Sequence, residues 1–61
     1  MTKKEMIMEI IEGTNFLNKE KVIENRCKAS KERIEKVYNY YLKSNKTKED
    51  KLFCINLLVV F

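Results

Sequence analysis

The chain has 61 residues, which is enough for one small domain with a thin core but too few for a dinucleotide-binding fold or a barrel. It lacks histidine, tryptophan and proline, and its single glycine is Gly13. Without histidine, a Ser-His-Asp or Cys-His nucleophile and the common zinc and iron sites are excluded within the chain. One glycine excludes Gly-rich phosphate loops. We therefore expect one all-α domain over residues 1–61 that is not an enzyme and takes no cofactor, metal or small-molecule substrate.

The charge is concentrated in the middle of the chain. The net charge is +4, from 13 basic and 9 acidic residues, and residues 18–46 hold nine of the basic side chains against four glutamates. A basic stripe on one element is typical of nucleic-acid binders, but a solvated, lysine-rich helix surface gives the same pattern. Both interpretations stay open at this stage.

The two cysteines and the apolar C-terminal stretch bear on location. The first residues lead into no uninterrupted apolar run of the signal-peptide kind, so we expect a cytoplasmic protein with Cys27 and Cys54 reduced and packed as small core residues. The apolar stretch 52–61 is ten residues long, and a membrane span needs about 20. We therefore expect no membrane association.

Capping signals predict the first two helices. Thr2 and Glu5 fit a capping box, and Gly13 suits the left-handed position that ends a helix. Asn18 is a suitable N-cap for a second helix from Lys19 to about Cys27. In the connection we expect Phe16 and Leu17 to point inward, with Leu17 and Val22 forming a hydrophobic staple. The buried face of the second helix is predicted to consist of Val22, Ile23 and Cys27.

The third segment carries the strongest periodic signal. Ser30 is the predicted N-cap of a helix from Lys31 to Lys43, with Ala29 and Ile34 at staple positions. Apolar residues recur at helical spacing and predict its buried stripe, which consists of Ile34, Val37, Tyr38 and Tyr41. Of the three tyrosines, only Tyr40 is expected to point away from the core.

A second capping box at Thr47 and Asp50 predicts a fourth helix that runs from Lys48 toward the end of the chain. Its last ten residues are apolar nearly all round, so three short helices cannot enclose it and some surface should remain for a partner. The β-branched residues make a strand the competing prediction for residues 55–61. The predicted partner interface consists of Leu52, Phe53, Leu57, Val60 and Phe61.

The spacing of the second and third helices resembles the helix-turn-helix of DNA-binding regulators over residues 18–41. Apolar residues stand at the offsets where the two helices of that motif cross, namely Ile23, Cys27, Ala29, Ile34 and Val37. The chain departs from the motif at two positions. Glu24 replaces the usual small residue, and Lys28 replaces the turn glycine and would have to adopt a conformation near the left-handed region.

The resemblance implies a small transcription regulator, of the kind that phages, plasmids or low-GC bacteria carry, whose third helix enters the major groove of double-stranded DNA. It also implies a homodimer joined through the C-terminal helix on an operator with two half-sites. The nucleic-acid-binding residues would be Ser30, Lys31, Arg33, Lys36, Tyr40 and Lys43.

The alternative is a small helical adaptor or inhibitor, of a phage or mobile-element type, that binds a protein through residues 52–61. Its basic face would meet an acidic partner. The segment Ile34–Val37 also loosely resembles the helix motif of helical-hairpin phosphatases of sporulation control, but the Ser-Gln pair that precedes that motif is absent.

Overall fold

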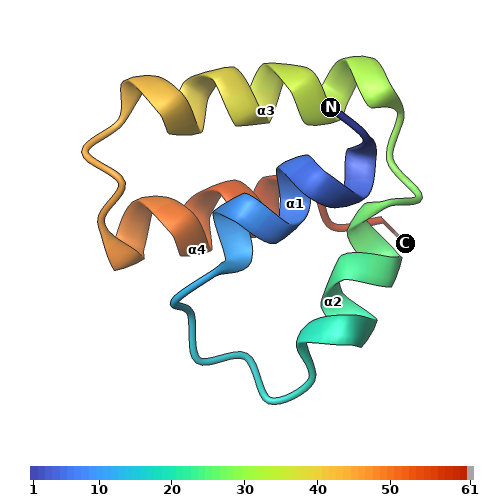
Figure 1. The fold of residues 1–61 in the computed structure, drawn as a ribbon, viewed down its shortest axis with the longest axis horizontal. Helices are drawn as coiled ribbons and strands as arrows, with labels where there is room; N and C mark the ends of the chain where they lie inside the picture. The colour runs from blue at the N-terminus through green and yellow to red at the C-terminus, as the bar shows by residue number, and fades with distance from the viewer. Residues whose placement is uncertain (61) are drawn as a thin grey trace.

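The computed structural model describes residues 1–60, which form four α-helices and no strand (Figure 1). The helices are α1 (Lys3–Ile11), α2 (Lys19–Arg26), α3 (Lys31–Lys43) and α4 (Lys48–Leu57). The prediction of a small all-α domain is thereby confirmed. Helices α3 and α4 lie side by side, α1 packs against both, and α2 lies across one end of this layer (Figure 1).

Local capping explains where each helix begins. The side chains of Thr2, Asn18, Ser30 and Thr47 each accept a hydrogen bond from the backbone N–H three residues later. Both predicted capping boxes are present, because the N3 acids Glu5 and Asp50 accept in turn from the cap N–H. At the other end of α1, Gly13 has φ +82°, the conformation that glycine adopts without strain.

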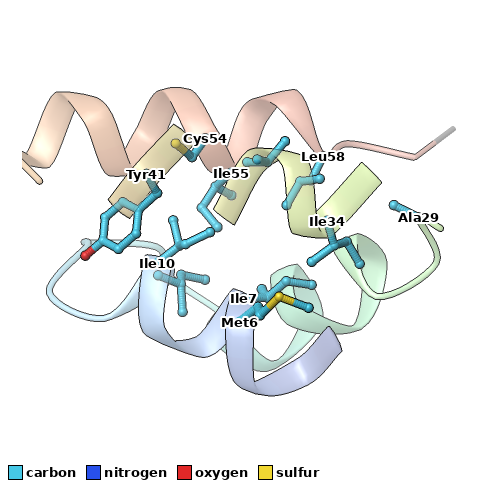
Figure 2. Close-up of a cluster of buried hydrophobic side chains, with 11 residues drawn as sticks. Met6, Ile7, Ile10, Ala29, Ile34, Tyr41, Cys54, Ile55 and Leu58 are labelled. Atoms are coloured by element: carbon cyan, nitrogen blue, oxygen red, sulfur yellow. The ribbon is translucent and has the colours of Figure 1, made fainter. Parts of the chain in front are cut away.

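The core lies where α1 meets α3 and α4. Figure 2 shows the α1 side chains directed at those of α3 and α4. Ile34, Val37 and Tyr41 of α3 are buried as their spacing predicted. Tyr38, predicted in the same stripe, is only half-buried at the edge of the core. The buried apolar residues are Met6, Ile7, Ile10, Ile11, Ala29, Ile34, Val37, Tyr41, Cys54, Ile55 and Leu58.

Helix α2 is attached more loosely than predicted. Val22, Ile23 and Cys27 are only half-buried, so the prediction of a buried face is wrong in degree, because α2 has just eight residues and packs mainly against α1. Leu17 is fully exposed, so the predicted inward position and the staple with Val22 are wrong. Thr14 and Phe16 take the inward positions of this connection instead.

Helix α4 ends earlier than expected. Its last helical residue is Leu57, Leu58 is the C-cap, and Val59 and Val60 continue without regular structure. The strand alternative is therefore wrong for residues 55–60, and the helical prediction holds as far as Leu57. Phe61 lies outside the described residues. Within residues 1–60, no helix combines the length and apolar character needed to cross a membrane.

Candidate interaction surface

Helices α2 and α3 are separate, and α3 begins after the predicted N-cap Ser30. Four residues separate α2 from α3, and the two helices run in different directions (Figure 1). The turn itself differs from expectation. Lys28 does not take a left-handed conformation, since among residues 1–60 the only non-glycine residue with positive φ is Lys46. The turn closes instead through hydrogen bonds from the N–H groups of Lys28 and Ala29 to the carbonyls of Asn25 and Arg26.

Two of the six predicted nucleic-acid-binding residues, Arg33 and Tyr40, contact α4. The Arg33 guanidinium donates a hydrogen bond to the carbonyl oxygen of Leu57 at the end of α4. The Tyr40 ring packs against the ring of Phe53, with their centroids 5.8 Å apart and the planes inclined at 51°. Both side chains therefore hold α3 and α4 together.

The other four predicted residues differ in their surroundings. Ser30 is the N-cap, and its hydroxyl accepts from the Arg33 N–H at 3.2 Å. Lys31 is exposed. It lines a groove beside α1 that Met1 and Glu35 also line. Lys36 and Lys43 are exposed. Arg33, Lys36, Tyr40 and Lys43 stand at helical spacing on one face of α3, whereas Lys31 lies on another side and Ser30 caps the helix.

Lys36 is paired at the surface. Its ammonium lies 3.7 Å from the Glu32 carboxylate, and the two side chains are 78% and 83% exposed. Such an i,i+4 pair is worth about 0.3–0.5 kcal/mol, so it leaves the lysine free to change partner.

The exposed part of α4 contains two of the five predicted interface residues. Phe53 is 50% and Leu57 39% exposed, one helical turn apart on the same face. Tyr40 of α3, 50% exposed, lies against Phe53 and extends this surface across the two helices. We call the set Tyr40, Phe53 and Leu57 the α3–α4 apolar surface. Leu52 and Val60 are half-buried, and Val60 packs against the core. Phe61 lies outside the described residues.

From the sequence, Tyr40 was predicted to bind nucleic acid because it points away from the buried stripe of α3. Its contact with Phe53 follows only from the lateral packing of α3 on α4. In the sequence, only the all-round apolar character of residues 52–61 pointed to the contact between Tyr40 and Phe53. An apolar side chain that the core does not cover needs another apolar neighbour.

Three lysines lie where the end of α3 connects to the start of α4. Lys43 ends α3, Lys48 begins α4, and Lys46 lies in the short connection between them. All three are exposed, and Glu49 is the exposed acid beside them. The Lys46 ammonium also lies 5.9 Å from the centre of the Tyr41 ring, within reach of a cation–π contact. This end of the α3–α4 pair therefore carries three exposed lysines and one exposed glutamate, Glu49, which lies one helical turn before Phe53.

Other reactive groups are dispersed. Cys27 and Cys54 are free thiols, and burial raises the pKa of the Cys54 thiol. The Tyr38 hydroxyl donates a hydrogen bond to the Glu9 carboxylate, which raises the pKa of Tyr38. Within residues 1–60, no three His, Cys, Asp or Glu side chains are grouped so as to hold a metal ion.

The chain matches no protein-family model, and comparisons with curated proteins and with solved structures find no match either. Inferences about its function therefore start from the surfaces described above.

Proposed function

We propose that the chain is a small protein-binding domain that uses the α3–α4 apolar surface to bind an amphipathic segment of a protein partner. The observation that supports it is the pair of half-exposed aromatic rings, Tyr40 and Phe53, packed against each other beside the exposed Leu57. Aromatic side chains on rigid elements bury large areas at little cost in side-chain entropy and are enriched at interfaces.

The charge around this surface specifies the partner further. Lys43, Lys46 and Lys48 lie where α3 connects to α4, and the net charge of the chain is +4. An apolar segment with acidic flanks would match both features, since complementary rim charges favour encounter and orientation. We infer that the partner presents apolar side chains at helical spacing with Asp or Glu beside them.

This function is tested with three synthetic amphipathic helical peptides that share one apolar face and differ only in acidic, neutral or basic flanks. In NMR titrations we expect the acidic peptide to bind most tightly and to shift the signals of Tyr40, Phe53 and Leu57. Phe53→Asp should abolish this binding. Leu17→Asp is the matched control, because Leu17 is the most exposed large apolar residue among residues 1–60 and lies in the connection between α1 and α2.

Two outcomes would contradict the proposal. One is equal, weak binding of all three peptides with shifts outside the α3–α4 apolar surface. The other is self-association in sedimentation runs that Phe53→Asp abolishes, which would identify a second copy of the chain as the occupant.

A second candidate function is DNA binding by α3 in a dimeric regulator. The separate α2 and α3, with Lys31, Lys36 and Lys43 exposed on α3, favour it. Because Arg33 and Tyr40 already contact α4, the contacts with bases and phosphates would come mainly from the lysines. A homodimer through Phe53 and Leu57 would supply the two half-sites.

Fluorescence anisotropy with a random duplex tests this second function. Binding should weaken steeply as salt rises, and Lys31→Ala with Lys36→Ala should reduce it more than the matched change Lys46→Ala with Lys48→Ala. Equal losses from both double variants would indicate nonspecific attraction, and no binding at low salt would remove the candidate.

A further inference from the structure

The segment that follows α4 is held by side chains of α2. The Asn25 amide nitrogen donates to the Val60 carbonyl oxygen at 3.0 Å, and the Val60 N–H donates back to the Asn25 side-chain oxygen at 3.3 Å. The neighbouring Arg26 donates to the carbonyl oxygen of Ile55 at 3.2 Å and to the Asn25 oxygen at 3.1 Å. Two of these hydrogen bonds therefore join α2 to Val60, one joins α2 to α4, and one lies within α2 and orients the Asn25 side chain.

These polar contacts matter because the apolar side chains of α2 are only partly buried against the core. Helix α2 contains no buried residue, whereas α3 contains three. Ile23 lines two grooves, one on each side of α2. Lys4 and Cys27 also line the first groove, and Met8 and Ile11 also line the second. Solvent therefore reaches both edges of the helix. Few buried apolar contacts and exposed edges are the features of a segment that opens locally.

We propose that α2 and the segment Val59–Val60 form a clasp that opens and closes as one unit while α1, α3 and the body of α4 stay folded. Leu58 does not belong to the clasp, because it is fully buried in the core. Opening unfolds α2 and this segment together. It breaks the Asn25–Val60 pair and the Arg26 hydrogen bond to Ile55 of α4, and it uncovers Val60 together with the side of α1 that Ile23 covers. The clasp would thus control access to a second apolar region, distinct from the α3–α4 apolar surface.

Native-state hydrogen exchange of the full chain tests the clasp. In the wild type we expect α2 amides and the Val60 amide to exchange at least tenfold faster than core amides such as those of Ile10 and Val37, yet to remain protected. The decisive variant is Asn18→Ala, which removes the α2 N-cap, whose side chain accepts from the Lys21 N–H at 3.2 Å. This residue does not contact Val60, so an effect on Val60 requires coupled opening.

We expect Asn18→Ala to speed exchange at Val60 roughly fivefold, by the same factor as in α2. Thr47→Ala is the matched control, since it removes the N-cap at the far end of α4, which stays folded when the clasp opens, and should leave exchange at both Val60 and α2 unchanged. The clasp is overturned if Val60 is unprotected in the wild type, if Asn18→Ala speeds α2 exchange without Val60, or if α2 exchanges only with the core.

Discussion

Arg33 of α3 donates a hydrogen bond to the carbonyl oxygen of Leu57, the last residue of α4. The last carbonyls of a helix lack partners within the helix, and a cation there also interacts favourably with the helix dipole. Arg26 donates to the carbonyl oxygen of Ile55, two residues before Leu57, which also accepts from the Leu58 N–H. Arg26 and Arg33, the chain's two arginines, therefore stabilise the end of one helix.

This contact predicts the effect of removing the guanidinium. Arg33→Ala should lower the free energy of unfolding by about 1 kcal/mol, the range of a hydrogen bond in a solvent-exposed position. Lys36→Ala, which removes a charge from the same helix but only an exposed ion pair, should cost less than about 0.5 kcal/mol. Urea denaturation followed by circular dichroism measures both. Equal losses would show that the Leu57 contact contributes nothing beyond surface charge.

An aspartate should unfold the chain at Ile55 of α4 but be tolerated at Phe53, two residues earlier. Ile55 is fully buried, and truncating such a side chain costs about 2–5 kcal/mol, comparable to the whole stability of a domain this small. Ile55→Asp should therefore leave an unfolded chain. Phe53 is half-exposed, so Phe53→Asp should keep the helical circular dichroism spectrum, with a loss of about 1 kcal/mol from the lost ring contact with Tyr40. An unfolded Phe53→Asp variant would contradict this assignment.

The capping box of Thr2 and Glu5 makes the stability of the fold depend on pH in the acidic range. The Thr2 N–H donates to the Glu5 carboxylate, and this bond lowers the pKa of Glu5 below its ordinary value of 4.5. A lowered pKa in the folded state means that the unfolded chain binds more protons, so the contribution is present above the ordinary value and is lost as the pH falls through the folded pKa. Glu5→Gln should keep the cap and flatten the decline of the melting temperature below pH 4.5. If the melting temperature of Glu5→Gln falls with pH as steeply as that of the wild type, the role of Glu5 is contradicted.

The Tyr38–Glu9 pair predicts an alkaline effect. The hydrogen bond to Glu9 raises the pKa of Tyr38 above its ordinary value of 10.0. A raised folded pKa means that the contribution to stability is complete below the ordinary value and disappears as the pH rises through the folded one. An ultraviolet titration should show one tyrosine ionising late, and both Tyr38→Phe and Glu9→Gln should remove that late step. Its persistence in Tyr38→Phe would assign it to another tyrosine.

The two thiols should differ in reactivity. Cys54 is fully buried, and burial raises its thiol pKa, whereas Cys27 is half-exposed at the edge of a groove. Because the thiolate is the reactive form and must be reached, a thiol reagent should label Cys27 rapidly and Cys54 only through unfolding. Mass spectrometry of Cys27→Ser and Cys54→Ser variants measures the two rates. Comparable rates for Cys54 and Cys27 would show that the core opens as easily as the edge.

The sequence alone determined where the helices begin and which stripe of α3 enters the core. A cap joins residues three apart, as Thr2 and Glu5 or Ser30 and Arg33 do, so its chemistry is complete within one turn. The spacing of Ile34, Val37 and Tyr41 is equally local, since helical geometry alone places them on one face.

Only the tertiary structure decided which neighbours the remaining side chains meet. Arg33 and Tyr40 looked like free surface residues until α4 was packed beside α3, and Leu17 looked like a core residue until Thr14 and Phe16 filled the inward positions. These outcomes depend on contacts between segments far apart in the chain, where competition for limited core volume selects which apolar side chains are covered. That competition left Phe53 and Leu57 half-exposed, and so created the surface on which the proposed function depends.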